Sequence, residues 1–353
     1  MIGVTSQQYQ RILRTALAAR YAKKPGAYGG SIMLLGDTGI GKTDSTEHAF
    51  DSVVCPKCGK HDVPVLPFYM SQMAVEDVKG LYVYSVQHDK VRLHPNPDFQ
   101  LDSECPRVYF LDEFTTVNAP MQKASLEFTL KHAIGGTKLP HGSIVVLGGN
   151  RVVDAADVED MVRPQRTRIT FLEYQFSDDA WFDWAVKKGV HPYVVSYLHS
   201  KPSMIYKPDV NAQHGEPLPR TWERTSEIIH TFQQDDWEPL INGTIGEGSC
   251  VEFMAWTATA GTLMPIVDRV LAGENVAAPE LSAQFFISSV LVDRFVKNPK
   301  LAERMCSYAI WSADKNPEAA AIMIKDGARV GKDKLMASPS WKKAVARLAD
   351  YVV

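Results

Sequence analysis

The sequence predicts an α/β protein in which a parallel sheet of five strands lies between helices, followed by a wholly helical region. Five short apolar runs predict the strands, at residues 31–35, 65–68, 108–111, 144–147 and 169–172. From Asp178 onward, apolar residues recur at helical spacing instead. A chain of 353 residues also exceeds one ordinary core, so we expect more than one packed unit.

Composition favours a globular protein of the cytoplasm. The chain is 45% hydrophobic and 22% charged, and it has no run of about eighteen apolar residues that would predict a membrane span. Its amphipathic start lacks the apolar block of a signal peptide. The net charge of −3, with scattered basic residues, argues against tight nucleic-acid binding, although basic loops inside an oligomer's pore would escape this test. Five cysteines do not suggest a disulfide framework.

A phosphate-binding loop follows the first of these strands. The run GDTGIGKT fits the pattern GxxxxGK(S/T) in full and stands between a predicted strand and a predicted helix. The glycines let backbone N–H groups turn toward phosphates, while the lysine reaches the outer phosphate oxygens and the threonine hydroxyl binds Mg²⁺. ATP with Mg²⁺ is the expected ligand, and GTP is the alternative. The expected nucleotide-binding residues are Gly36, Thr38, Gly39, Ile40, Gly41, Lys42, Thr43 and Asp44.

Polar side chains end two further strands. Asp112 and Glu113 follow a buried strand, where carboxylates are costly unless they have a role. Asp112 suits a ligand of Mg²⁺ and its water, and Glu113 suits the base that orients the attacking water. Asn150 ends the next strand and can hold that water against the γ-phosphate.

An arginine-rich segment precedes the last predicted sheet strand. Arg163, Arg166 and Arg168 form either a solvated face or an arginine finger that reaches the nucleotide of a neighbouring subunit.

The order of these features resembles the AAA+ ATPases, in particular the compact MoxR-like type common in bacteria and their phages. The likeness covers roughly residues 8–235 and includes SQMAVEDVKGL, KLPHG, GNR and LPRTW as further family-like segments. Carried over by position, the resemblance implies that Asn150 is sensor 1, Arg220 is sensor 2 and Arg168 is the finger. Ile169 replaces the phenylalanine that usually follows the finger, so Arg166 and Arg163 stay open as substitutes.

The resemblance also implies an organisation and partners. We expect a nucleotide-binding α/β domain at 1–175, a helical lid at 176–235 and a helical extension at 236–353. It further implies a homo-oligomer, a hexameric ring, that acts on a protein client or works with a von Willebrand A-domain partner. An insert within helix 2, at residues 71–95, resembles the part that faces the ring channel. There Tyr82 or Tyr84 either grips a polypeptide or packs on a hairpin strand.

A possible zinc knuckle stands apart from these features. The run CPKCGKH offers Cys55, Cys58 and His61 with the C-x2-C spacing of zinc sites. In an AAA+ sheet the strands after His61 and after Cys105 are neighbours, so Cys105 becomes the expected fourth ligand. His88 and His94 are alternatives to His61, and ordinary loop cysteines are the alternative to a metal site. Nucleotides bind at the opposite ends of parallel strands, so zinc here would be structural.

Three functions follow as hypotheses. The first is an ATP-hydrolysing motor that remodels or activates a protein complex. The second is a nucleic-acid motor for replication or packaging, which basic pore residues and stimulation by DNA or RNA would reveal. The third is a nucleotide-gated scaffold with little turnover, which the presence of Glu113 and Asn150 argues against.

Overall fold

The computed structural model describes residues 3–26, 28–86, 89–151, 159–209, 212 and 214–351. The chain divides into two compact units, Met1–Ser177 and Asp178–Val353. The helices expected to form the lid and those expected to form the extension both lie in the second unit.

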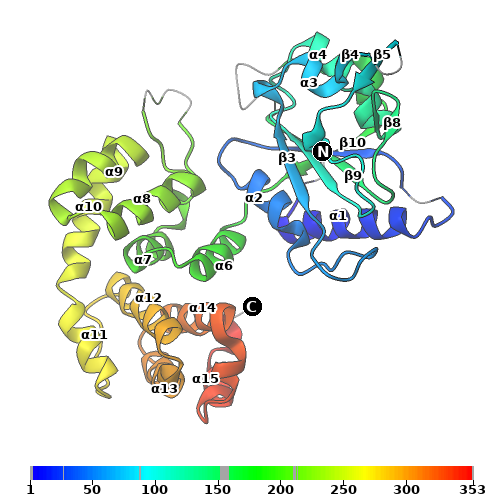
Figure 1. Cartoon of the computed structure of the whole chain (residues 1–353). Helices are drawn as coiled ribbons and strands as arrows, with labels where there is room; N and C mark the ends of the chain where they lie inside the picture. The colour runs from blue at the N-terminus through cyan, green and yellow to red at the C-terminus, as the bar shows by residue number, and fades with distance from the viewer. Residues whose placement is uncertain are drawn as a thin grey trace. The chain divides into compact units, whose positions relative to one another are not determined.

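The first unit is built on a six-stranded parallel sheet with the order β1-β10-β2-β9-β6-β3. Figure 1 labels three of these strands, β3, β9 and β10. The predicted fold class, a parallel sheet with helices followed by a helical region, is confirmed, but the sheet has one strand more than the predicted five. The additional strand, β1, has two residues, too few for an apolar pattern to reveal it. The strands are β1 (Gly3–Val4), β2 (Ser31–Leu35), β3 (Val65–Tyr69), β6 (Val108–Asp112), β9 (Ile144–Gly149) and β10 (Ile169–Tyr174).

The centre of the sheet forms the core of the first unit. Every residue of β6 and β9 is buried, as expected for parallel strands covered on both faces. Short helices and turns connect the strands: α1 (Ser6–Tyr21), α2 (Lys42–Glu47), η1 (His48–Phe50), η2 (Met70–Gln72), α3 (Val75–Lys79), η3 (Pro97–Phe99), α4 (Ala119–Ala124), η4 (Glu127–Lys131) and α5 (Arg163–Arg166). Two hairpins add β4 (Leu81–Ser85) with β5 (Lys90–His94), and β7 (Ala133–Ile134) with β8 (Thr137–Lys138).

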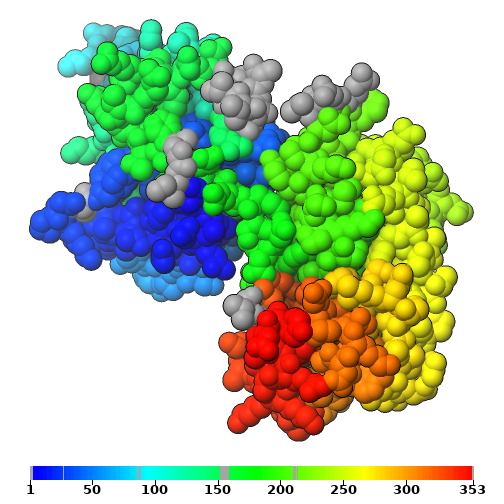
Figure 2. Space-filling view, turned by 180° about the vertical axis from the view of Figure 1, so that it is seen from behind, coloured from blue at the N-terminus to red at the C-terminus, as the bar shows by residue number. Residues whose placement is uncertain are grey.

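The second unit is helical. In its C-terminal half α12 carries eleven buried residues and contributes to a core cluster with α11, α13, α14 and α15; Figure 2 shows the side chains from α10 to α15, yellow to red, as one continuous body. The helices are α6 (Asp178–Lys188), α7 (Pro192–Ser200), α8 (Pro219–Thr231), α9 (Trp237–Ile245), α10 (Glu247–Gly261), α11 (Met264–Leu271), α12 (Leu281–Lys297), α13 (Ala302–Ser312), α14 (Pro317–Met336) and α15 (Trp341–Arg347). Short 3-10 turns lie between them, at η5 (Pro202–Met204), η6 (Gln234–Asp236) and η7 (Pro299–Leu301), and a further one, η8 (Ala349–Tyr351), follows α15.

Among the described residues, no single helix has the length and apolar composition needed to cross a membrane. The pair α10 and α11, bent by 46° at the break between them, meets those two criteria together.

Candidate functional site

The phosphate loop connects the end of β2 to the start of α2. Gly39 and Gly41 adopt positive φ angles of 73° and 88°, a conformation that side-chain-bearing residues rarely take. Gly36 is tightly packed, since an added Cβ would lie 2.9 Å from the Ile40 side chain. The glycines of the motif therefore have steric reasons to be where the sequence has them.

Lys42 stands at the centre of the loop. Its Nζ donates to the carbonyl oxygens of Gly36 and Asp37 at 2.8 and 2.6 Å, and to Oδ1 of Asn150 at 3.0 Å. The side chain is buried, with 8% of its surface exposed. These three oxygens take up the three N–H donors of the ammonium, so a phosphate would bind Lys42 by replacing some of them. The contact with Asn150 joins the loop to the end of β9.

A second contact joins the loop to β6. The Thr43 hydroxyl donates to Oδ2 of Asp112 at 2.6 Å, and the other carboxylate oxygen accepts the Glu113 N–H at 2.9 Å. A hydroxyl and a carboxylate directed at one another are hard oxygen ligands of the kind that Mg²⁺ takes in nucleotide sites. The residues present thus fit Mg²⁺, and Thr43 and Asp112 would hold it.

Two glycines at the end of β9 leave room for this arrangement. A Cβ on Gly148 would lie 2.4 Å from Oδ1 of Asp112, and one on Gly149 would lie 2.6 Å from the Thr115 side chain. Thr115 in turn accepts the N–H of Asn150 at 2.9 Å. Gly148 and Gly149 are therefore packing partners of the site rather than only a turn.

Glu113 lies just beyond β6 with a positive φ of 56°, and its side chain is exposed. The Ser71 hydroxyl, from η2 beyond β3, donates to Oε2 of Glu113. The sequence did not single out Ser71 or Thr115, because serine and threonine carry no signal until the ends of neighbouring strands meet.

The candidate finger residues lie at the other end of the sheet. Arg163, Arg166 and Arg168 are exposed, and Ile169 pairs with Ser31 at the start of β2. Five residues of strand separate that position from Gly36, a distance of about 17 Å along the sheet. Arg168 therefore cannot reach the phosphate loop of its own chain. Arg220 lies exposed in the first turn of α8, directly after Pro219, in the second unit.

The insert at 71–95 contains η2, α3 and the β4–β5 hairpin (Figure 1). Tyr82 is 77% exposed, whereas Tyr84 is 55% exposed and its hydroxyl donates to Oδ1 of Asp89 within the hairpin. Leu81, Val83, Val86 and Val91 are exposed as well, so the hairpin presents apolar side chains outward.

The predicted metal ligands come together. One ligand atom each from Cys55, Cys58, His61 and Cys105 lies within 4.8 Å of all the others. The Lys60 backbone N–H lowers the pKa of the Cys58 thiol to about 7, while desolvation, followed by the neighbouring sulfurs, raises the pKa of Cys105 to about 11. His94, at the end of β5, is not in this group, and His88 lies outside the described residues.

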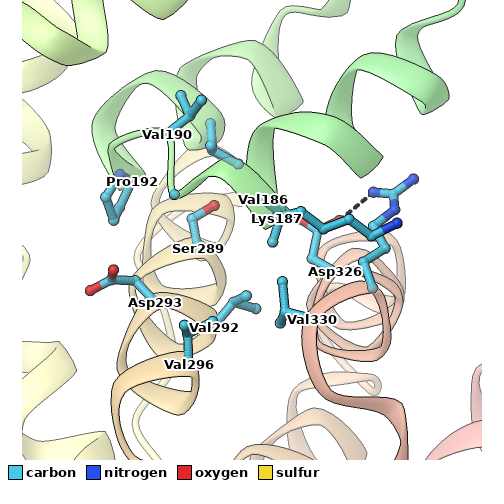
Figure 3. A pocket seen from close by; sticks show the side chains of 13 residues that line it. Val186, Lys187, Val190, Pro192, Ser289, Val292, Asp293, Val296, Asp326 and Val330 are labelled. Atoms are coloured by element: carbon cyan, nitrogen blue, oxygen red, sulfur yellow. Dashed lines mark hydrogen bonds and ion pairs between the residues drawn. The ribbon is translucent and has the colours of Figure 1, made fainter. Parts of the chain in front are cut away.

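The second unit contains a pocket of about 340 Å³ between α6, α7, α12 and α14 (Figure 3). Valine is the commonest residue in its lining. Asp326, which lies at its edge, accepts from Nε2 of the buried His199 at 2.8 Å and also pairs with Arg329. Aliphatic lining and mutually paired charges are typical of packing between helices.

Comparisons with known proteins found no matching family model and no matching curated protein. Solved structures with a similar course of the chain include a RuvB variant from Thermotoga maritima, with 14% identity over 78% of this chain and 82% of that chain, at a TM-score of 0.39. A DNA replication initiation factor matches at 13% identity over 97% and 94% of the two chains, with a TM-score of 0.37. A DNA polymerase III gamma subunit-related protein from Thermotoga maritima matches at 12% identity over 98% and 91%, with a TM-score of 0.30.

Proposed function

We propose that this chain binds ATP with Mg²⁺ at Gly36–Thr43 and hydrolyses it as a subunit of an oligomeric AAA+ motor similar to the MoxR-like ATPases. One observation carries the proposal most directly, the 2.6 Å hydrogen bond between the Thr43 hydroxyl and the Asp112 carboxylate. It joins a phosphate loop to a buried acid followed by a second acid, the arrangement that phosphoryl transfer to water requires.

The chain's own residues supply the chemistry around the γ-phosphate. Lys42 binds phosphate oxygens, and its contact with Asn150 holds the amide beside the reacting group. The Glu113 carboxylate accepts the proton of the attacking water, so that the products are ADP and inorganic phosphate. Mg²⁺, when bound, neutralises negative charge on the phosphates.

The active site is completed by a second subunit in this proposal. Arg168 lies too far from its own phosphate loop, so an arginine finger from this segment acts on the neighbour's nucleotide. Arg166 and Arg163, on α5, are the substitutes if Arg168 is dispensable. Arg220 is the sensor that couples the nucleotide to movement of the helical unit. The resemblance favours a hexameric ring.

The motor acts on a protein, with the β4–β5 hairpin as the element that contacts it. Exposed tyrosine and aliphatic side chains on one hairpin suit contact with an extended polypeptide, because they offer apolar area without a fixed sequence requirement. The resemblance adds a von Willebrand A-domain protein as an expected partner. The cysteine cluster lies at the opposite ends of the strands, so a metal there takes no part in hydrolysis.

The test compares the purified chain with Glu113→Gln and Lys42→Ala variants, with ATP and GTP as substrates. Glu113→Gln should keep nucleotide affinity and lose turnover by about 100-fold or more, because it removes the general base alone. Lys42→Ala should lose affinity as well. Glu247→Gln, an exposed glutamate of α10, is the matched control and should leave both unchanged.

Equal, slow phosphate release from the wild type and Glu113→Gln would contradict a motor. Tight binding without hydrolysis would then point to a nucleotide-gated scaffold.

A further inference from the structure

Four metal-binding side chains gather at the amino ends of β3 and β6. Cys55, Cys58 and His61 lie in the segment before β3, and Cys105 lies three residues before β6. Because Val65 pairs with Val108 in parallel register, the chain segments that precede β3 and β6 lie side by side. The nucleotide residues follow the other ends of the strands, and the seven residues from Cys105 to Asp112 span up to about 23 Å.

The spacing of the four ligand atoms matches a single tetrahedral ion. Bonds of about 2.3 Å from zinc to sulfur place tetrahedral ligands about 3.8 Å apart. The four atoms lie within 4.8 Å of one another, and Cys58 Sγ is 3.3 Å from His61 Nε2. A disulfide would involve only two of these sulfurs and would not explain why the histidine and the third thiol lie beside them.

The hydrogen bond of His61 to the backbone favours the tautomer that binds a metal. Nδ1 of His61 lies 2.8 Å from the carbonyl oxygen of Asp62, and a carbonyl only accepts, so Nδ1 carries the proton. In the neutral ring the lone pair is then on Nε2, the atom that faces the sulfur of Cys58. A backbone partner that fixes the ring in this way is a common companion of metal-binding histidines.

Backbone hydrogen bonds shape the knuckle into a short hairpin. Gly59, with a φ of 66°, donates its N–H to the Cys55 carbonyl at 2.9 Å. The Cys55 N–H donates to the His61 carbonyl at 2.7 Å, and Val54 pairs with Asp62 in an antiparallel bridge. This short hairpin presents Cys55, Cys58 and His61 on one side, ready for a fourth ligand from another part of the chain.

We propose that Cys55, Cys58, His61 and Cys105 bind one structural Zn²⁺, which fastens the hairpin of residues 53–63 to the start of β6. Three thiolates and an imidazole are soft ligands that select zinc over Mg²⁺ or Ca²⁺. With four protein ligands the site has no open position for a substrate, and this closed coordination is typical of structural zinc. The ion would hold β6, which carries Asp112 at its far end, to the segment before β3, without touching the nucleotide.

The first experiment measures metal in the full chain, expressed without added zinc and desalted before elemental analysis. We expect about one zinc per chain in the wild type and almost none in Cys58→Ser and Cys105→Ser. Cys250→Ser, a buried cysteine of α10 outside the cluster, should keep the zinc. Lys42→Ala should also keep it, so that loss of nucleotide binding and loss of metal are separable.

A second measurement avoids variants that fail to fold. Removal of zinc from the wild type with a chelator that spares Mg²⁺ should lower the thermal unfolding midpoint, and Co²⁺ added afterwards should give the visible bands of a tetrahedral thiolate site. Less than about a tenth of an equivalent of zinc together with no Co²⁺ bands would overturn the proposal. Full zinc retention by Cys105→Ser, or a Cys55–Cys58 disulfide in protein kept free of oxidants, would overturn it as well.

Discussion

The pH dependence of the second unit's stability can be predicted from His191, because the surroundings of this residue oppose its protonation. The ring caps the start of α7, where Nδ1 accepts the N–H of Tyr193 at 3.1 Å. A proton on Nδ1 would remove this bond and place positive charge at the positive end of the helix. Burial, His230 and Lys297 lower the pKa of His191 from 6.5 to about 4, against an opposing effect of Asp293.

The sign of the effect follows from the lowered pKa. The unfolded chain takes up a proton near pH 6.5, whereas the folded chain does so only near pH 4. The stabilisation is therefore complete above pH 6.5 and is lost as the pH falls toward 4. The gap between the two pKa values corresponds to about 3 kcal/mol, of which about 2 kcal/mol is lost by pH 5.

The variant His191→Asn isolates this term, since asparagine caps helices well and does not titrate. All seven tryptophans lie at Trp181 or beyond, so tryptophan fluorescence during urea unfolding reports on the second unit. Between about pH 7.5 and pH 5, the wild type should lose about 2 kcal/mol more than the variant. His132, whose pKa burial lowers to about 4, lies in the first unit, so His132→Asn is a matched control that should leave this signal unchanged. Equal losses in wild type and His191→Asn would refute the reasoning.

Three further predictions concern hydrolysis. Ser71→Ala should lower turnover about tenfold at unchanged ATP affinity, because it removes the hydroxyl that orients Glu113; unchanged phosphate release would contradict this. Gly148→Ala should reduce Mg²⁺-dependent turnover by displacing the Asp112 carboxylate, whereas Gly29→Ala, which meets nothing within 4 Å, should not; equal rates would show that the carboxylate position is unimportant. Arg168→Ala and Lys42→Ala chains, each inactive alone, should regain activity when mixed, and a mixture that stays inactive would count against a finger acting between subunits.

The features predicted best from the sequence are the longer sheet strands and the phosphate loop, because their patterns lie within a few consecutive residues. Of the two glycines that the motif fixes, Gly41 has a positive φ angle and Gly36 is tightly packed, and both are properties that the motif itself encodes. The strand β1 could not be predicted, because its two residues are defined by pairing with β10, far along the chain. The role of Gly148 could not be predicted either, because it depends on contact with the Asp112 side chain. Such long-range contacts leave no periodic pattern in the sequence.

The expected grouping of Cys105 with Cys55, Cys58 and His61 illustrates the opposite case. The distance between these residues along the chain does not predict that they meet. The expected parallel pairing of β3 with β6 does, because the residues that precede neighbouring parallel strands lie at the same edge of the sheet. The insert was less predictable, since the sequence left open whether its tyrosines pack on the hairpin. Exposure of Tyr82 depends on what lies above the strand, which periodicity does not encode.

Parallel strands also explain how one sheet separates two kinds of chemistry. Their carboxyl ends collect Lys42, Asp112 and Asn150 around one point, because the loops that follow neighbouring strands converge there. Their amino ends collect the cysteine cluster and Arg168, which no local rearrangement of a short strand can bring to the phosphate loop. A chain whose proposed finger, Arg168, and phosphate loop lie at opposite ends of one sheet is unable to complete the proposed active site by itself. Oligomerisation is then a requirement of the proposed catalysis, and turnover per chain should fall on dilution.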